Sequence, residues 1–359
     1  MPETTITTDK ELRKYLRLAM QLEHATIPPY LLALCSIHPG TNVDAVQVIR
    51  VVLVEEMLHL TLAANILNAV GGDPDLTAPG FVPLYPAYLP DGETDFVVDL
   101  QPFSPSAICT FLKIERPKAA PNEEMRRIHR PTAHRSSLAV DPDRPDMRYY
   151  SIGEFYEEIK RGLRFLHEKM GRDLFPDGRG SRQVTSEYYN SGGGKLFEVR
   201  DIESALAAVN LIIQQGEGFD YGIHTQTGEL AHDYRFEQLQ LGRYYMPADD
   251  VPRHPTGPEL KVDWNAVFPM RTNARLSDFE RSRELYDAAA EFNRSYGDFL
   301  ALLERAFNGK PELLEGAVPQ MFSLRYKIDQ LIRNPIPGKT GENAAPTFEI
   351  AGRGEEAAS

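Results

Sequence analysis

The most constraining feature of this sequence is an apolar segment that carries charges it cannot leave unpaired. Residues 43–70 form its longest apolar stretch, but Arg50, Glu55, Glu56 and His59 interrupt it. A membrane-spanning helix needs about 20 predominantly apolar residues in a row, so the segment instead predicts a long buried helix of a globular protein. Because burial of an unpaired carboxylate is costly, acids on such a helix predict a partner: a cation, a proton or a metal.

A second long helix with an acid on its apolar face is predicted just before this one. Thr8 and Glu11 have the spacing of a capping box at its start. Glu23 then falls in the middle of an apolar stripe, and the pair Pro28-Pro29 predicts a kink one turn later. Only a short loop separates the two predicted helices, so we expect them to pack as an antiparallel pair.

The rest of the chain predicts two more bundle helices and several additions. Helices are expected over residues 151–170 and 202–217, with a β-like run at 195–199 between them. Residues 73–147 contain twelve prolines and predict a long irregular insertion, with a strand at 96–100 and a short helix that begins at Ser104-Pro105. Two late helices are expected near residues 276–307 and 312–332.

These elements predict a mainly α fold built on a four-helix bundle with inward-facing carboxylates. The expected organisation is a metal-binding bundle over residues 1–245, a helical cap packed on it over residues 246–335, and a tail over residues 336–359. The apolar faces of the late helices would favour a homodimer.

Charge and cysteine content limit the possible binding partners and the cellular location. The chain has 39 basic and 52 acidic residues and a net charge of −13, the wrong sign for binding nucleic acid or an anionic membrane. Cys35 and Cys109 are too few for a disulfide framework, and the N-terminal residues lack an apolar signal core. We therefore expect a cytoplasmic protein.

The spacing of Glu56 and His59 is that of a metal-binding helix. E-x-x-H allows one helix to give a carboxylate and an imidazole to the same metal pair, and Glu23 would face it from the preceding helix. Glu55 lies as close to the apolar face as Glu56 does. It could be the ligand itself, a group that holds His59, or a charge partner for Arg50 or another arginine.

Matching ligands from the second half of the chain are less clear. The candidates are Glu154, Glu157 and Glu158 on the helix at 151–170, Glu217 at the end of the next helix, and the pair Glu229 and His232 beyond it. Glu154 equally suits a capping box with Ser151. The usual glycine-rich nucleotide motifs, C-x-x-C and G-x-S-x-G are all absent from the sequence, which leaves flavin, nucleotide and serine-hydrolase functions without support.

Several segments resemble the ferritin-like family named for iminophenyl-pyruvate dimer synthase, whose domain also occurs in the chromopyrrolate synthases of violacein and rebeccamycin biosynthesis. The resemblance covers almost the whole chain and rests on the order and number of short motifs. These are LEHATIPPYL (22–31), EEMLH (55–59), NILNAVGG (65–72), FLKIERP (111–117), IGEFY (152–156), QGEG (215–218), ELAHDYRF (229–236) and AAPTFE (344–349).

The resemblance implies a ferritin-like bundle with a dinuclear iron site, in a family whose members couple two amino-acid-derived imines oxidatively. Carried over by position, the implied metal ligands are Glu23, Glu56, His59, Glu154, Glu217 and His232. One departure is that Glu217 and His232 are separated by 14 residues, so the second half lacks an E-x-x-H within one helix. Glu115 is a reserve ligand, and a mononuclear or non-iron site is the alternative.

The leading functional hypothesis is a non-haem di-metal oxidase or oxygenase, with two irons per chain or manganese in their place. Its substrates would be O2 and a small amino-acid-derived or aromatic metabolite of secondary metabolism. Tyr30, Tyr234 and Glu55 are the candidate catalytic residues around the metals. The alternatives are a protein that handles iron without an organic substrate, and a metal-free binding or scaffold protein whose acids pair with arginines.

Overall fold

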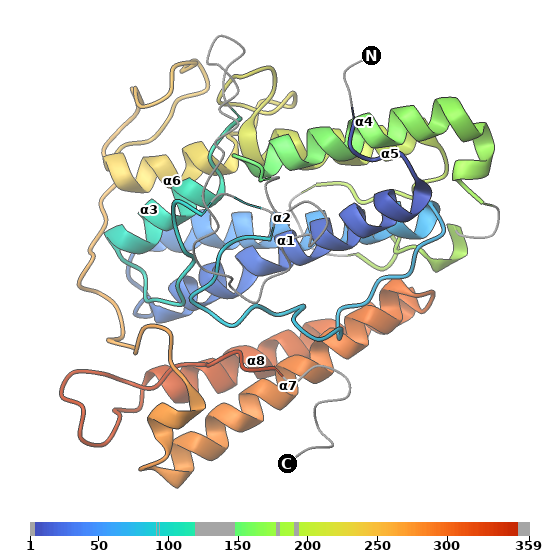
Figure 1. Ribbon diagram of the computed structural model, residues 1–359. Helices are drawn as coiled ribbons and strands as arrows, with labels where there is room; N and C mark the ends of the chain where they lie inside the picture. The colour runs from blue at the N-terminus through green and yellow to red at the C-terminus, as the bar shows by residue number, and fades with distance from the viewer. Residues whose placement is uncertain are drawn as a thin grey trace.

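The computed structural model describes residues 4–90, 92, 94–118, 148–176, 180–189 and 194–350, and this part of the chain is helical without a β-strand. Figure 1 shows the arrangement. The α-helices are α1 (Asp9–Ser36), α2 (Val43–Ala69), α3 (Pro105–Ile114), α4 (Ile152–Met170), α5 (Ile202–Glu217), α6 (His232–Leu241), α7 (Arg283–Phe307) and α8 (Ala317–Ile332).

The long pair α1 and α2 forms the centre of the molecule, as the sequence predicts. Thr8 caps α1 with the predicted capping box, in which its side chain accepts from the Glu11 amide. Pro28 and Pro29 both lie inside one continuous α1. A proline at position 29 removes the amide that would reach the Ala25 carbonyl, and the Tyr85 hydroxyl donates to that carbonyl instead at 2.8 Å.

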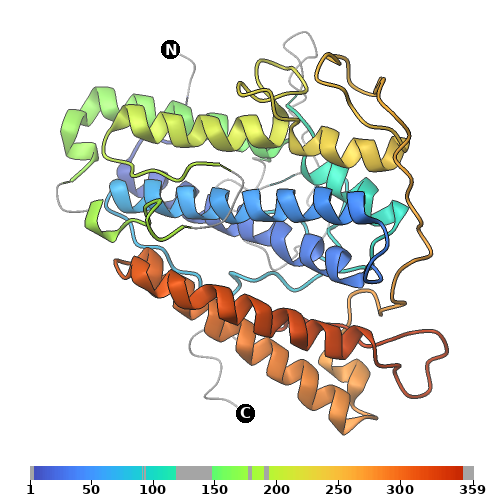
Figure 2. The same ribbon diagram turned by 180° about the vertical axis from the view of Figure 1, so that it is seen from behind.

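The other two columns of the bundle are each made of two helices that meet end to end. The helices α4 and α3 pack on α1, whereas α5 and α6 pack on α2, and the pairs α4–α5 and α3–α6 are in contact. Figure 2 shows α5 and α6 following one another almost in line. The C-terminal ends of α3 and α5 therefore face the N-terminal ends of α4 and α6 halfway along the bundle.

The conformation of one glycine explains why the column formed by α5 and α6 is interrupted after α5. Gly218, directly after α5, has φ +89°, and a Cβ there would lie 2.0 Å from the Gly222 carbonyl oxygen. The predicted helix at 202–217 ends as expected, whereas the sequence interpretation did not include α6. The predicted strands at 96–100 and 195–199 are wrong: the first makes only one isolated bridge, between Ala87 and Val98.

The two late helices pack against the open side of the α1–α2 pair (Figure 1). They begin later than predicted, because 3-10 turns occupy Leu276–Phe279 and Pro311–Gly316. Two aromatic side chains of α8 are exposed, Phe322 at 69% and Tyr326 at 64%; the homodimer stays a prediction. No helix in the described ranges has both the length and the apolar character needed to cross a membrane.

A buried amide on α2 ties the bundle to the loop between α4 and α5. Asn65 donates to the carbonyls of Val184 and Phe197 and accepts from the Val184 amide at 3.0 Å. Replacing Asn65 by Ala would leave these buried backbone groups unpaired. We predict that Asn65→Ala lowers the free energy of unfolding by about 2–3 kcal/mol, measured by urea denaturation.

The matched control is Gln47→Ala on the exposed side of the same helix. It should change the free energy of unfolding by no more than about 0.5 kcal/mol. Equal stabilities of the two variants would contradict the anchoring role of Asn65.

Candidate metal centre

Three predicted ligands from the central helix pair meet in a first cluster, defined as Glu23, Glu56 and His59. All three side chains are buried, and their ligand atoms lie within 4.8 Å of one another. His59 Nδ1 is 3.5 Å from Glu23 Oε2 and 3.6 Å from Glu56 Oε1. Antiparallel packing of α1 on α2 therefore brings together the E-x-x-H pair and the acid of the facing stripe.

A second cluster, defined as Glu56, Glu115 and His232, shares Glu56 with the first. Its ligand atoms also lie within 4.8 Å of one another. His232 Nδ1 is 3.1 Å from Glu56 Oε1 and 3.3 Å from Glu115 Oε2. Glu115 is the C-cap of α3 and His232 the first residue of α6, so both enter the bundle from the broken columns. One carboxylate oxygen thus lies between the two imidazoles.

Both histidines are oriented for metal binding through Nδ1. His232 Nε2 is 2.7 Å from Glu55 Oε2 and His59 Nε2 is 3.0 Å from Gln215 Oε1. Because an ionised carboxylate or an amide oxygen can only accept a hydrogen bond, each Nε2 carries a proton, and an imidazole that gives up its second proton to bind a metal directs the lone pair of Nδ1 toward the clusters. Glu55 holds His232, not His59, and its other oxygen lies 3.5 Å from Arg235.

Two hydroxyl groups fix the carboxylates that serve the second cluster. Thr26 Oγ1 lies 2.7 Å from Glu56 Oε2 and 2.7 Å from the Glu23 carbonyl oxygen, which share its single proton, and the Tyr30 hydroxyl donates to Glu115 Oε1. Glu23 differs, because its buried Oε1 has no hydrogen-bond partner in the described structure. The buried Tyr156 hydroxyl makes no hydrogen bond of ordinary geometry, but it lies beside Glu23 and its polar interaction with the carboxylate lowers the pKa of Glu23.

The protonation states show how much negative charge the clusters bury. Burial raises the pKa of Glu23 to about 7 and also raises that of Glu115. Burial alone would lower the pKa of His59, but Glu23 and Glu56 raise it to about 10. The pKa of His232 is likewise raised by surrounding glutamates against the effect of burial. The imidazoles therefore supply the counter-charge that a bound metal would otherwise provide.

The donor set fits two metal ions. Each cluster offers two carboxylates and one imidazole nitrogen, the ligands of ferritin-like di-iron and di-manganese proteins. The Glu23 oxygen without a hydrogen bond supports this fit, because a buried carboxylate oxygen is costly unless a cation or a proton neutralises it.

The structure places the other predicted residues outside both clusters. Glu154 caps the start of α4, where its carboxylate accepts from the Tyr150 amide and its own amide donates to Ser151 Oγ. Tyr234 packs against Tyr245 in a separate small apolar cluster. The reserve candidate Glu157 pairs with lysines and Glu229 is exposed.

Glu217 lies beside the clusters but its carboxylate is used otherwise. Its oxygens accept from the Gly153 amide at 2.7 Å and the Lys118 amide at 3.0 Å. A Cβ on Gly153 would lie 2.3 Å from this carboxylate, so only glycine leaves room for it at the start of α4. Burial raises the pKa of Glu217 to about 7.

Sequence reasoning missed Gln215, Thr26 and Tyr156 and ranked Glu115 only as a reserve. Gln215 sits two residues before Glu217 in the QGEG motif, and Thr26 lies three residues after Glu23, so an i+3 test for groups beside a ligand could have found Thr26. Glu115 follows a short apolar helix and is the only acid of that segment between Pro105 and Pro117. That signal was available but lacked a periodic partner.

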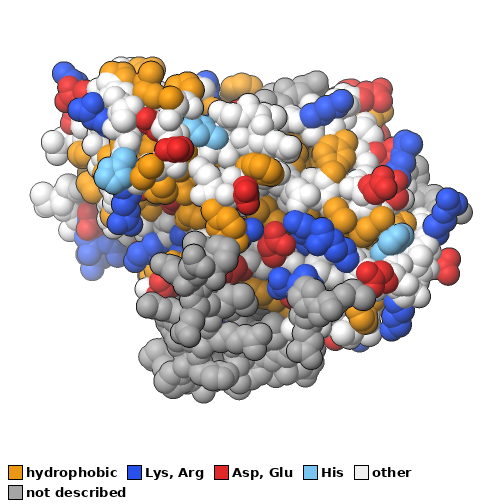
Figure 3. Space-filling model, turned by 90° about the horizontal axis from the view of Figure 1, so that it is seen from above, with side chains coloured by type: hydrophobic (Ala, Val, Ile, Leu, Met, Phe, Trp, Pro, Cys, Tyr) orange, Lys and Arg blue, Asp and Glu red, His pale blue; other side chains and the backbone are white. Residues whose placement is uncertain are grey.

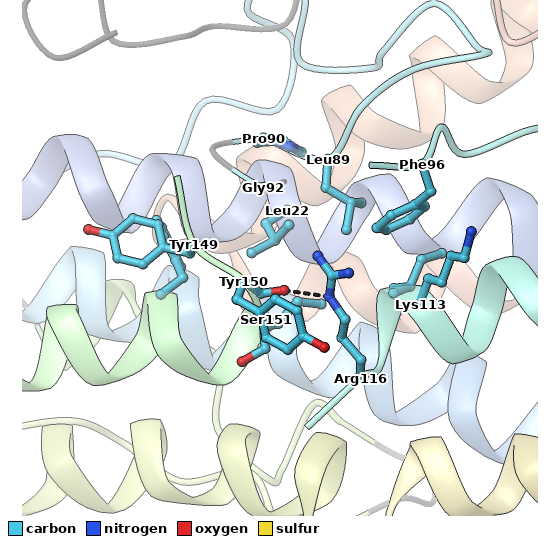
Figure 4. Close-up of a pocket in the computed structure, with 13 residues that line it drawn as sticks. Leu22, Leu89, Pro90, Gly92, Phe96, Lys113, Arg116, Tyr149, Tyr150 and Ser151 are labelled. Carbon is cyan, nitrogen blue, oxygen red and sulfur yellow. Dashed lines mark hydrogen bonds between the residues drawn. The ribbon is translucent and has the colours of Figure 1, made fainter. Parts of the chain in front are cut away.

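Two neighbouring pockets lie beside the clusters. The inner pocket is lined by Glu23, Glu56, His59 and Glu115, by Ile212, Ile213, Gly216 and Glu217 of α5, and by Ile152 and Gly153 of α4. The outer pocket (Figure 4) is mostly apolar, with Leu22, Phe96, Tyr149 and Phe155 among its walls, and it shares Ile152 with the inner one. Ile152 is therefore the partition between them.

Two cations border the outer pocket. Arg116 is tied down: it bonds Asp95 at 2.8 Å and the Tyr150 carbonyl at 2.5 Å, and its guanidinium lies over the Tyr150 ring (Figure 4). The Lys113 ammonium lies 5.8 Å from the Phe96 ring centroid and has no acidic partner within the described ranges. The molecular face over α4, α5 and α6 mixes charges of both signs with apolar side chains (Figure 3), unlike a nucleic-acid-binding surface.

The raised pKa of Glu217 makes a prediction for the metal-free protein. A carboxyl whose pKa is higher folded than unfolded stabilises the fold below about pH 4.5, and that contribution is lost as pH rises through about 7. Glu217→Gln removes this pH dependence of the stability. The free energy of unfolding of the variant minus that of the parent should therefore be about 2–3 kcal/mol larger at pH 8 than at pH 4.5. Urea denaturation at both pH values measures this.

Glu154→Gln is the control, because it makes the same chemical change on the same side of the bundle at a less buried carboxylate. Its difference from the parent in free energy of unfolding should be nearly the same at both pH values. If the difference between Glu217→Gln and the parent is also the same at both pH values, the buried, protonated state of Glu217 is contradicted.

Comparisons with known proteins agree with this architecture. A family model described as Ferritin-like matches residues 16–241. Dichlorochromopyrrolate synthase of Lentzea aerocolonigenes is 25% identical over 324 residues, which cover 82% of this chain and 29% of that protein; the chain thus spans less than a third of that relative's length. The crystal structure of a ferritin-like protein from Caulobacter vibrioides matches with a TM-score of 0.60 and 25% identity, over 91% of this chain and 96% of that one. This chain belongs to the ferritin-like family.

Proposed function

We propose that this protein is a non-haem di-metal oxidase or oxygenase, with iron as its metal, that acts on a small amino-acid-derived metabolite. The observation that carries the proposal is the pair of buried clusters that share Glu56 and receive both histidines through Nδ1. Glu23, Glu56 and His59 would hold one ion, and Glu56, Glu115 and His232 the other. Two iron ions held there would supply electrons to O2 and accept electrons from the substrate.

The choice of chemistry draws on the relatives as well as on the site. Carboxylate and imidazole ligands suit manganese as well as iron, and the family resemblance favours iron. The relative from Lentzea aerocolonigenes is a synthase of dichlorochromopyrrolate by its name, which supports an oxidative step in secondary metabolism. Oxidative coupling of two imino acids is the specific reaction that the family resemblance supports.

The chain's own residues have distinct roles in this proposal. Glu55 and Gln215 keep each imidazole proton at Nε2, and Tyr30 fixes the orientation of Glu115. Glu217 is the buried acid of the inner pocket that can hold or accept a proton at its carboxylate. Tyr234 packs away from the clusters, so we assign it no step.

The outer pocket is the proposed substrate site. Its apolar and aromatic walls suit a planar hydrocarbon group, and Lys113 is the cation at its border without an acidic partner in the described structure. A carboxylate paired with Lys113 would orient the rest of an amino-acid-derived molecule past Ile152 toward the metals. Closure of the pocket around an apolar group would also keep water from the metal side.

The metal assignment predicts a stoichiometry. Protein expressed with iron and purified without an affinity tag that binds metal should contain about two irons per chain, measured by plasma mass spectrometry. Glu56→Ala should lose both ions, because Glu56 belongs to both clusters, whereas Glu154→Gln should keep both. Full metal content in Glu56→Ala, or its loss in Glu154→Gln, would overturn the assignment.

The substrate pocket predicts an anion preference. Phenylpyruvate, a stable carboxylate analogue of an aromatic imino acid, should bind the parent protein, and Lys113→Met should weaken its binding about tenfold, or about 1.4 kcal/mol. Isothermal calorimetry measures both. Lys10→Met, an exposed change at the start of α1, should leave the affinity unchanged; equal affinities of parent and Lys113→Met would contradict the role of Lys113.

A further inference from the structure

We infer that the two metal positions are unequal, and that Glu55 and Gln215 make them so. The position formed by the second cluster binds its ion first and retains it. The position formed by the first cluster binds more weakly and is the one that exchanges and faces the substrate. This inference rests on the proposed function, because it requires that both clusters bind metal.

The groups behind the two histidines differ in charge. His232 Nε2 donates to the Glu55 carboxylate at 2.7 Å, whereas His59 Nε2 donates to the neutral Gln215 amide oxygen at 3.0 Å. A carboxylate behind an imidazole increases its basicity and hence its strength as a metal ligand. Both contacts are buried, so solvent screens this difference little.

The hydrogen bonds to the carboxylates also favour the second cluster. Glu115 is oriented by the Tyr30 hydroxyl, and the shared Glu56 by Thr26. Glu23, the acid found only in the first cluster, has a buried Oε1 without a hydrogen bond in the described structure. Each carboxylate of the second cluster therefore has a hydroxyl group beside it at hydrogen-bond distance, whereas Oε1 of Glu23 has none.

Access separates the two positions as well. All three residues of the first cluster line the inner pocket, whereas Glu56 and Glu115 of the second cluster line it and His232 does not. Ile152 lines both pockets, so the inner pocket beside the first cluster borders the proposed substrate site. The weaker position is thus the one whose ligands all line the inner pocket.

Titration of the metal-free protein with Co(II), followed by visible absorption, tests the inference. The parent should bind Co(II) in two separate steps. Glu55→Gln keeps the shape and an acceptor oxygen but removes the charge, and should weaken the tighter step about 10–100-fold while leaving the weaker step unchanged. Gln215→Glu should do the reverse and tighten the weaker step, so that the two steps approach each other.

Thermal unfolding of each metal-free variant checks that it is folded before titration, and His232→Ala and His59→Ala assign the steps. His232→Ala should remove the tighter step and His59→Ala the weaker one. Two equal steps in the parent, or equal weakening of both steps in Glu55→Gln, would overturn the inequality but leave the di-metal function standing. A parent that binds no Co(II) would overturn the proposed function itself.

Discussion

The structure depends on one buried carboxylate. Glu56 Oε1 lies between the Nδ1 atoms of His59 and His232, at 3.6 and 3.1 Å, and all three side chains are buried. Hydrogen bonds from His232 and His59 outweigh the effect of burial and lower the pKa of Glu56. The ionised Glu56 carboxylate therefore lies between two imidazoles whose pKa values are raised by the surrounding glutamates, one supplied by α2 and the other by α6.

The broken columns of the bundle supply the second half of this site. A continuous fourth helix could present one E-x-x-H motif, but here α5 stops at Glu217 and α6 begins at His232. The helix ends exposed by the break are satisfied locally: Ser151 caps α4, and Glu217 accepts from the Gly153 amide near the start of the same helix. The same interruption leaves space for the inner pocket between the ends of α4 and α5, next to the first cluster.

The sequence predicted the features that follow the periodicity of a helix. The capping box at Thr8 and the apolar stripe around Glu23 defined α1, and the E-x-x-H spacing placed Glu56 and His59 on the facing side of α2. The ferritin-like family assignment is confirmed.

The second half of the site could not be predicted in the same way. Glu115 and His232 come from helix ends separated by 116 residues of chain between them, and no periodicity relates them. Glu154 was ranked as a ligand although its spacing from Ser151 equally fitted the cap that the structure shows. Gln215 and Tyr30 act by holding ligands, a role that depends on three-dimensional contacts.

The central claim is that one carboxylate serves two metal positions. The most direct measurement is a crystal structure of the iron-loaded protein with anomalous diffraction recorded on both sides of the iron absorption edge. The account predicts two iron peaks, one beside Glu23 and His59 and one beside Glu115 and His232, with Glu56 in contact with both. A single peak, or peaks bound by Glu154 or Glu217 in place of Glu56, would contradict it.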